Sequence, residues 1–385
     1  MTTVRKLDGS DAGGQFLRTA LGLAVCRNEP IRIENVRGDR SEPGLRHQHL
    51  AVVETMAECC DAAVSGAELG SETIGFDPTA ETRHAATYNE RSSRTTDSSG
   101  RDGAIAGGQY VVDIGTAGSV TLLFDALLPL ATVLESPLSV TVTGGTDVQW
   151  SPPIDYFQSV KLPLLRRFGL VAACEVDRRG FYPDGGGRAT LHLAPSQLEP
   201  IDLHERGAVT GVRLYSTEAA SLADRDVARR QAAGARKRLE SALGRTVTSD
   251  HGDDSDGSAC ELLERRETTA ASDCPGSALV VRLEHAHGVA GFSALGERGK
   301  PAERVGEDAA DAANRFLETD APVDRHMADQ LLVFLALAGG RVRLPTVTDH
   351  VEASRELLDS FDVPIDLVAD AETTVATVSR TGDPM

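Results

Sequence analysis

The sequence predicts an α/β (α+β) fold, in which a body of repeated helix–strand–helix segments carries a smaller inserted unit. Its 385 residues exceed the usual length of one domain, so two domains or one domain with a large insertion are expected. Three stretches share one layout, an amphipathic helix, a short alternating strand and a second helix after a turn. A segment with another order of elements separates the second stretch from the third. These observations predict a threefold body with an insertion.

Each repeat is recognised by helices with apolar residues at three- and four-residue spacing and by a strand in which apolar and polar residues alternate. Helices are expected at 13–27 and 43–60, at 117–134 and 152–169, and at 325–340 and 349–361. The strands between them are expected at 30–38, 137–145 and 341–348.

The segment between the second and third repeats predicts a separate small domain. We expect a strand, a long helix, two strands and another helix, at 208–216, 224–243, 277–288, 289–297 and 301–318. This βαββα order is typical of a unit inserted in a loop of a larger body. We therefore assign 1–197 and 321–385 to the body and 198–320 to the inserted domain. Two polar stretches, 89–103 and 248–259, are expected to be surface loops.

The charge of the chain is strongly acidic, with a formal net charge of −19. Its only lysines are Lys6, Lys161, Lys237 and Lys300, so nearly every cation is an arginine. This composition predicts a surface suited to high intracellular salt, with arginine retained where bidentate binding of anions matters. It disfavours broad nucleic-acid binding through a basic face but allows a local arginine pocket for one phosphorylated end.

The cysteines and the apolar runs exclude several other classes of protein. Six cysteines are scattered without CxxC spacing, which disfavours a zinc site or a disulfide framework. No apolar run is long enough to span a bilayer, and the polar start disfavours a signal peptide. We expect a soluble, cytoplasmic protein without a membrane partner.

Two neighbouring segments carry the residues expected to bind phosphate. In LDGSDAGGQFLR a carboxylate and two glycines precede a helix, and Arg18 lies about one turn into it. In VRGDRSEPGLRHQHL several cations gather beside a Pro-Gly turn, among them Arg37, Arg40 and Arg46. A turn and a solvated loop are the simpler interpretations, but convergent arginines suit a terminal phosphate.

The third repeat carries the candidate nucleotide-binding and nucleophilic residues. His326, Asp329 and Gln330 share one face of the first helical turn, and Asp324 is a reasonable N-cap. After the strand, Asp349 and Glu352 have the spacing of a capping box, which places His350 at the first helical position. The positive end of a helix disfavours an imidazolium, so a neutral, nucleophilic ring is expected there.

Taken together, these segments resemble the RNA 3′-terminal phosphate cyclase family, in an archaeal, halophile-like form. The likeness covers most of the chain outside the insert and the two polar loops, and it implies three βαβαββ-type repeats with a smaller inserted domain. Eight segments match in order: LDGSDAGGQFLR, RSEPGLRHQHL, GAELGS, DIGTAGSVTLL, GGTDVQWSPPIDYF, GFYPDGGG, HMADQLLVFLALAGG and the histidine of TDH.

The resemblance implies an ATP-dependent ligase of RNA processing. Such an enzyme converts an RNA 3′-phosphate to a 2′,3′-cyclic phosphodiester and releases AMP and diphosphate. His350 matches the histidine that takes AMP covalently from ATP, before AMP passes to the RNA end as RNA(3′)pp(5′)A. The implied ligands are ATP, RNA 3′-phosphate ends and Mg²⁺ or Mn²⁺.

The resemblance also implies the other site residues. The nucleotide-binding helix start is matched by His326, Met327, Ala328, Asp329 and Gln330. Two further positions, Asp125 and Pro152, match ATP-binding residues, and that of Pro152 packs near the adenine. The positions that line the phosphates are Arg18, Arg37, Arg40 and Gln48. Asp11 is expected to bind the metal.

Three positions depart from the family pattern. The first motif is two residues shorter than usual and offers Asp11 where the family has a glutamate. Asp125 stands where the family commonly has a glutamine, and a carboxylate near a triphosphate needs an intervening cation. Ala353 and Ser354 replace a Thr-Asn pair that often follows the histidine.

Two alternatives belong to other functional classes. A cyclase-like ribosome-assembly factor shares the fold but lacks the nucleophilic histidine, so His350 and the HMADQ segment favour the enzyme. An enolpyruvyl-type transferase, built on similar repeats, would need a lysine-rich phosphate site, which four lysines do not easily supply.

Overall fold

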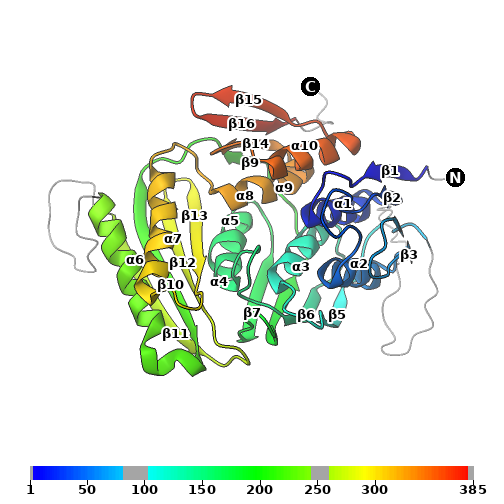
Figure 1. Ribbon diagram of the computed structural model, residues 1–385. Coiled ribbons are helices and arrows are strands. Elements are labelled where there is room, and N and C mark those ends of the chain that lie inside the picture. Colours follow the sequence, from blue (N-terminus) through cyan, green and yellow to red (C-terminus); the bar gives the residue numbers. More distant parts are fainter. Residues whose placement is uncertain (1–2, 81–102, 244–259, 380–385) are drawn as a thin grey trace.

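The computed structural model describes residues 3–80, 103–243 and 260–379. The two polar stretches expected to be surface loops, 89–103 and 248–259, lie outside these ranges except for Gly103. The body and the insert lie side by side, with the insert at the left of Figure 1 and the first repeat at the right.

Three small sheets of the body share one strand order. In each, the first two strands are parallel, and the third and fourth join them by antiparallel pairing. The first sheet has the order β1 (Arg5–Asp8), β2 (Ile31–Glu34), β4 (Ile74–Asp77) and β3 (Ala63–Ser65). The second is β5 (Gly108–Asp113), β6 (Leu138–Gly144), β8 (Gly187–Leu193) and β7 (Ala172–Arg178). The third is β9 (Ile201–Leu203), β14 (Gly340–Leu344), β16 (Thr373–Val378) and β15 (Asp366–Asp370).

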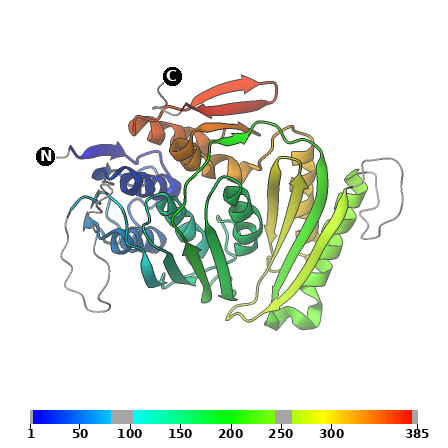
Figure 2. The same cartoon turned by 180° about the vertical axis from the view of Figure 1, so that it is seen from behind.

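Helices follow the first and second strands of each sheet and pack together at the centre of the body (Figures 1 and 2). The first repeat has α1 (Gly14–Arg27) and α2 (His47–Cys60). The second has α3 (Val120–Leu127) with the turn η1 (Leu128–Thr132), then α4 (Ile154–Tyr156), η2 (Phe157–Lys161) and α5 (Leu162–Arg166). The third has α8 (Arg325–Gln330), α9 (Leu332–Ala338) and α10 (Asp349–Ser360). One apolar core joins all three repeats.

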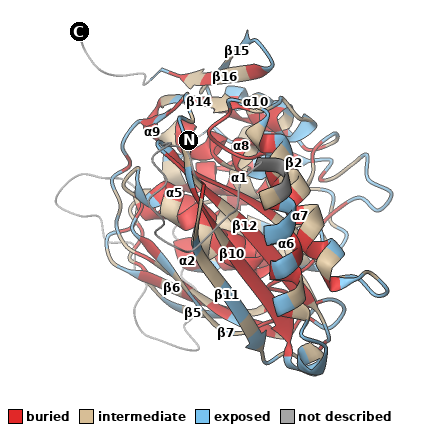
Figure 3. Cartoon of the chain, turned by 90° about the vertical axis from the view of Figure 1, so that its left-hand side faces the viewer, coloured by how far each residue is buried: buried red, intermediate tan, exposed pale blue. Residues whose placement is uncertain are grey.

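The insert is a four-stranded sheet covered by two helices. Its sheet has the order β11 (Glu261–Ala270), β10 (Val209–Ala219), β12 (Ser277–His285) and β13 (Gly288–Leu295). The 3₁₀ turn η3 (Ala220–Arg225) leads into α6 (Val227–Leu243), and α7 (Ala302–Leu317) follows β13. Figure 3 shows α6 and α7 over buried β10 and β12, with their outer faces exposed.

Two details of the insert differ from the sequence prediction. The βαββα order is wrong by one strand, because β11, which is parallel to β10, was not predicted. Half of its residues ELLERRETTA are charged, as suits an edge strand, so they lack the apolar alternation of a half-buried strand. β9 falls within the range expected for the insert but pairs with β14 of the body.

Buried polar side chains join the insert to the body. Asp155 of α4 accepts hydrogen bonds from Arg179 at 2.8 Å, from Thr217 of β10 at 3.1 Å and from Arg266 of β11 at 3.0 Å. Asp324, the N-cap of α8, also accepts from the backbone nitrogen of Gly291 in β13 at 2.9 Å. Since a buried carboxylate needs such partners, these bonds fix the insert against the helices that carry the candidate site.

The predicted fold class is confirmed, because the structure is a mixed α/β protein of small sheets and packed helices. Among the helices of the described residues, none is long and apolar enough to cross a membrane.

Candidate active site

The candidate site lies where the first turn of α1 faces the first turns of α8 and α10. His350 of α10 is exposed, and its ring lies beside Gly13, the N-cap of α1. A Cβ placed on Gly13 would come within 4.0 Å of His350 Cε1 and 3.3 Å of Arg40 Nη2. Residues from the first and third repeats therefore meet around the start of α1.

The helix that carries His350 begins differently from the prediction. Thr348, not Asp349, is the N-cap of α10, and its hydroxyl accepts a hydrogen bond from the backbone nitrogen of Val351 at 3.3 Å. Asp349 is the first helical residue and His350 the second. The side-chain oxygen of threonine can cap a helix as that of aspartate can, and both residues stand in the segment TDH. His350 remains in the first turn, where the positive end of the helix lies.

Asp329 of α8 is the acidic residue that faces His350. The residue is half-buried, and its Oδ1 has no hydrogen-bond partner among the described residues, while Gln15 of α1 lowers the pKa of the carboxyl through a hydrogen bond. Burial raises the pKa of Asp329, while the neighbouring His350, His326 and Lys161 lower it. A carboxylate beside an imidazole can orient the ring and stabilise positive charge on it.

Arg18 of α1 lies one turn beyond Gly14 and has an unpartnered nitrogen. Its Nε is buried and makes no hydrogen bond to any residue that the structure describes. Burial lowers the pKa of Arg18 to about 10, and Asp329 opposes this shift. A buried nitrogen without a partner is uncommon in folded proteins, so the guanidinium has a free donor that could bind an anion.

His49 of α2 faces the same point as Arg18. A Cβ on Gly14 would lie 2.5 Å from His49 Nε2 and 3.2 Å from Arg18 Nη1. The backbone nitrogen of Arg46 donates to His49 Nδ1 at 3.2 Å. Burial, followed by the charges of Arg37, Arg18 and Arg46, lowers the pKa of His49 to about 3. The neutral ring therefore carries its proton on Nε2, which is a donor aimed at the start of α1.

The other predicted phosphate-binding residues fall into two groups. Arg40 is exposed beside Gly13, where α1 begins. Arg37 has φ of 56°, and its Nη1 donates to the carbonyl oxygens of Glu42 at 3.1 Å and Gly44 at 2.9 Å. Gln48 donates to the carbonyl oxygen of Ser119 at 3.0 Å, while its buried Oε1 is unpartnered. Arg40 can meet a ligand, whereas Arg37 and Gln48 also hold loops in place.

Asp11, the predicted metal ligand, lies beside a second carboxylate. Asp39 raises the pKa of the exposed Asp11 through a shared hydrogen bond and through its charge. In the part of the chain that the structure describes, no group of three or more His, Cys, Asp or Glu side chains is arranged to hold a metal. Two carboxylates fit Mg²⁺ or Mn²⁺ all the same, because such ions commonly take one or two carboxylates and complete their shell with phosphate oxygens and water.

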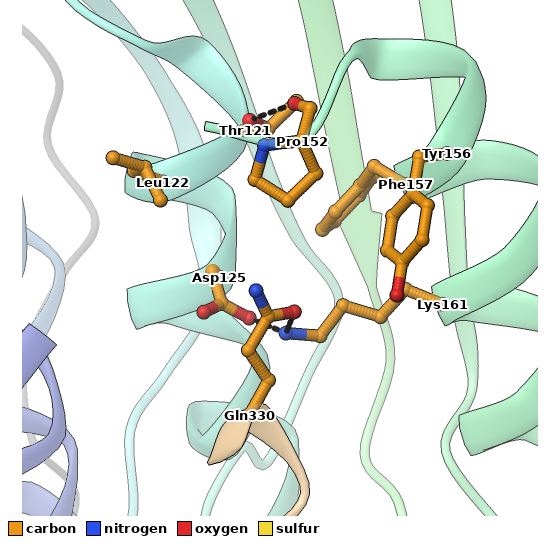
Figure 4. Close-up of a pocket in the computed structure, with 8 residues that line it drawn as sticks. All are labelled: Thr121, Leu122, Asp125, Pro152, Tyr156, Phe157, Lys161 and Gln330. Carbon is orange, nitrogen blue, oxygen red and sulfur yellow. Dashed lines mark hydrogen bonds and ion pairs between the residues drawn. The ribbon is translucent and has the colours of Figure 1, made fainter. Parts of the chain in front are cut away.

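A second part of the site is a small pocket between α3, η2 and α8 (Figure 4). The space open to a ligand in it is only about 10 Å³, room for roughly one water molecule, so the side chains that line it are closely packed. Its apolar side is formed by Leu122, Pro152, Tyr156 and Phe157, and its polar side by Thr121, Asp125, Lys161 and Gln330. Asp125 and Pro152, distant in sequence from Gln330, are thus brought together with it.

The HMADQ residues are divided between the site and the core. Asp324 caps α8 as predicted, with its carboxylate accepting from the backbone nitrogens of His326 and Met327, both at 3.0 Å. Met327 and Ala328 are buried in the core. Only their backbone can therefore face a ligand, whereas His326 is exposed and Gln330 lines the pocket.

Sequence reasoning gave no role to several residues of this site, namely Gln15, Asp39, Lys161 and His49, the last of which it named only as part of the arginine-rich segment. Gln15 and His49 lie within the motifs that predicted the site, so their places in GGQFLR and RHQHL could have indicated them. Lys161 had a different signal, because it is a lysine inside the apolar run VKLPLL of a chain with few lysines. Ser354, one of the departures, accepts a hydrogen bond from Gln15 at 3.4 Å.

Comparison with known proteins gives one consistent result. The family model described as RNA 3′-terminal phosphate cyclase matches residues 10–363. Among curated relatives, a protein of Halobacterium salinarum named RNA 3′-terminal phosphate cyclase is 45% identical over 94% of this chain and 96% of its own length. Proteins of the same name from Methanopyrus kandleri and Pyrococcus furiosus are 40% and 34% identical, and in each case 92% of this chain and 92% of the relative are covered.

Proposed function

Because the chain belongs to the RNA 3′-terminal phosphate cyclase family, we propose that it uses ATP to convert an RNA 3′-phosphate to a 2′,3′-cyclic phosphodiester. One observation carries the proposal beyond the family name. His350 is exposed in the first turn of α10, next to the unpartnered cationic groups at the start of α1 and to the carboxylate of Asp329. These groups can serve together as a nucleophile, an orienting acid and an anion-binding cluster, which supports the proposal.

His350 would act as the nucleophile. An imidazole nitrogen attacks the α-phosphorus of ATP, a phosphorus–nitrogen bond forms, and the bond to the leaving diphosphate breaks. Asp329 would orient the ring and stabilise the positive charge that develops on it. Its unpartnered Oδ1 is consistent with a contact made only when the ring turns toward a ligand.

The cationic cluster would bind the RNA 3′-phosphate and the phosphates of ATP. Arg18, Arg40 and His49 Nε2 supply donors around Gly13 and Gly14, where the first backbone nitrogens of α1 also point outward. An oxygen of the RNA 3′-phosphate then displaces His350 from the AMP phosphorus. The neighbouring 2′-hydroxyl attacks the 3′-phosphorus, AMP leaves, and the cyclic ester remains. Donors fixed around phosphoryl oxygens stabilise the transition state of each step.

A divalent ion would supply charge neutralisation at the phosphoryl oxygens. Asp11 and Asp39 are the residues that would hold it, since they are adjacent carboxylates beside the same turn.

Labelling of the protein tests this proposal. Purified protein is incubated with α-³²P-labelled ATP and Mg²⁺ or Mn²⁺ at high salt, and protein-bound label that is lost in acid and stable in base is measured. We expect such label on the wild-type chain and none on His350→Ala. The matched control is His287→Ala, because His287 lies in the insert and bonds only the carbonyl oxygen of Glu205 among the described residues.

A second assay follows the RNA. A 5′-labelled oligonucleotide with a 3′-phosphate should become resistant to phosphatase when the wild-type chain and ATP are present. Label that persists on His350→Ala would show that another residue is the nucleophile. Folded wild-type protein that neither becomes labelled nor cyclises RNA would favour the non-catalytic assembly factor.

A further inference from the structure

Two aromatic side chains of the second repeat project into solvent. Trp150 is 93% exposed and Tyr182 is 72% exposed. All other aromatic side chains that the structure describes are buried or partly buried. One exposed apolar residue is ordinary on a protein surface, but aromatic residues make up only 4% of this chain, and Trp150 is its single tryptophan. The exposure of both rings therefore calls for a reason other than chance.

The aromatic loops, residues 146–152 and 180–186, carry these two rings and are hydrogen-bonded to each other. Asp147 and Phe181 form a parallel β-bridge. The backbone nitrogen of Asp147 also donates to the carbonyl oxygen of Gly180 at 3.1 Å. Each loop presents one ring, so the two rings project from adjacent segments of backbone.

Buried contacts hold the aromatic loops in place. The guanidinium of Arg179 is buried and donates to Asp147 at 3.2 Å and to Asp155 at 2.8 Å. Phe181, the neighbour of Tyr182, is buried against the insert, where a Cβ on Gly276 would overlap its ring. An ordered backbone thus displays the outer rings, and a ligand that binds to them does not have to order the loops first.

The conformation of Trp150 adds a cost that folding does not explain. Its φ is 61°, in the left-handed region that a bulky side chain rarely adopts. Such a conformation costs about 1 kcal/mol or more and is found most often at functional sites. Since an exposed ring buries little apolar surface, neither its position nor its backbone stabilises the fold, and both are consistent with a binding role.

The aromatic loops are continuous with the phosphate-binding end of the site. A Cβ on Gly185 would lie 2.9 Å from the Cα of Ala117, so the loop of Tyr182 touches the loop that precedes α3. That same loop meets α2, because Gln48 donates to the carbonyl oxygen of Ser119. His49, the next residue of α2, faces the start of α1. Neighbouring contacts therefore connect the rings to the place where the RNA 3′-phosphate would bind.

The surroundings of the rings suit bases and not phosphates. The arginines that flank the loop of Tyr182 are paired, Arg178 with Asp273 and Arg188 with Asp177. The net charge of −19 also repels a polyanion from the surface as a whole. Stacking of a base on an aromatic ring needs no free cation, and every base has a face that can stack. High salt weakens phosphate contacts much more than stacking.

We propose that Trp150 and Tyr182 form a stacking platform for unpaired bases that precede the RNA 3′-phosphate, so that RNA with a single-stranded 3′ end is the preferred substrate. The inference rests on the proposed cyclase function and adds to it the form of RNA that the site accepts. Bases within a duplex already stack on and pair with each other, so they cannot lie on these rings without being opened.

Tryptophan fluorescence tests the platform directly, because all of this signal comes from Trp150. The wild-type chain, without ATP, is titrated with a single-stranded oligoribonucleotide of about ten nucleotides that ends in a 3′-phosphate. We expect saturable quenching. The same strand paired with its complement up to the last nucleotide should need a concentration about tenfold higher or more.

Two results of the titration would contradict the platform. One is the absence of quenching at RNA concentrations that saturate cyclisation. The other is equal quenching by ATP alone, since Pro152, two residues after Trp150, lines the pocket of Figure 4 and the ring could instead cover a nucleotide there.

Kinetics of cyclisation test the same platform by another route. Trp150→Ala and Tyr182→Ala should each raise KM for the oligonucleotide about five- to a hundredfold, as expected for one stacked base, with little change in kcat. Trp150→Phe keeps a ring and should recover most of the loss. Val368→Ala is the matched control, because Val368 is an exposed apolar residue on β15, an edge strand of the third sheet.

Labelling with ATP in the absence of RNA separates the platform from the nucleotide end. If Trp150→Ala lowers this labelling as much as it lowers cyclisation, the ring acts on the nucleotide and the platform is wrong. A wild-type chain that is quenched by RNA but neither becomes labelled nor cyclises RNA would instead contradict the proposed function. The two failures are therefore distinguishable.

Discussion

The two ends of the candidate site satisfy their charges in opposite ways. Around Gly13 and Gly14 two buried polar atoms, Arg18 Nε and Asp329 Oδ1, have no partner among the described residues, and His49 is kept neutral by burial and by nearby arginines. In the pocket of Figure 4 the charged groups bind each other, because Lys161 contacts both Asp125 and Gln330. The first end offers free donors to an anion, whereas the second has a fixed order of donors and acceptors.

This difference indicates what each end contributes to binding. Unpartnered cations gain strongly from a phosphate, but they do not distinguish one nucleotide from another. A paired, oriented set of groups gains little from charge and discriminates by the position of donors and acceptors. We therefore expect substitutions at the start of α1 to reduce all activity, and substitutions in the pocket to change the choice of nucleotide.

The largest effect is expected from Arg18→Met. Loss of a fixed donor to phosphoryl oxygens should lower RNA cyclisation by about 10²- to 10³-fold with either nucleotide. The same change removes a buried, unpartnered nitrogen, so it should raise the free energy of unfolding by about 1 kcal/mol. Cyclisation rates and denaturant unfolding at constant salt measure the two effects.

Arg206→Met is the control for this prediction. Arg206 also has a buried Nε without a hydrogen-bond partner among the described residues. It lies far from the start of α1, between β9 and β10, and its Nη1 donates to the carbonyl oxygen of Phe316 at 3.0 Å. Its substitution should reduce stability and leave cyclisation unchanged. If Arg18→Met kept full activity, the start of α1 could not be the phosphate-binding end.

The grouping of residues around Gly13 and Gly14 was largely predictable from the sequence because these residues are close together along the chain. Gly13, Gly14 and Arg18 lie in one short segment of the sequence, and Arg40 and Gln48 follow in a second. Local spacing and helix geometry are enough to bring such residues to one place. The convergence of α1 with His350, far along the chain in the third repeat, came only from the family resemblance.

The pocket of Figure 4, where Lys161 contacts Asp125 and Gln330, was not predictable in the same way. Lys161 meets Asp125 across 36 positions and Gln330 across 169, so no periodicity in the sequence could connect them. The departure at Asp125 indicated that a cation was needed, and the structure places the ammonium of Lys161 there. β11 was missed for another reason, because an edge strand of charged residues does not alternate.

A smaller effect is expected from Gly14→Ala, with Gly13→Ala as its pair. A Cβ on Gly14 would lie 2.5 Å from His49 Nε2, closer than real atoms approach, so His49 must move. We expect RNA cyclisation to fall by about tenfold, since small misplacements of donors are costly. At Gly13 the nearest atom would be Arg40 Nη2 at 3.3 Å, on an exposed, flexible side chain, so that variant should lose much less. Equal losses in cyclisation assays would show that His49 does not contribute to phosphate binding.

The smallest effect is expected in the pH dependence of nucleotide choice, which tests only the pocket around Lys161. The groups that face Lys161 are Asp125 and Gln330 by direct contact, with Asp329, Asp324 and Arg18 acting through charge. Since its pKa is lowered to about 7, the ammonium is present below that pH and lost above it. A neutral amine can accept as well as donate, so it no longer forces the Gln330 oxygen to face it.

The ATP to GTP labelling ratio of wild type should therefore change by about two- to fivefold between about pH 6 and pH 9. Taking a ratio removes the titration of groups that act equally on both nucleotides. In Lys161→Met the ratio should be independent of pH. A wild-type ratio that stays constant, or a slope that survives in Lys161→Met, would assign nucleotide choice to other groups and remove the distinction between the two ends.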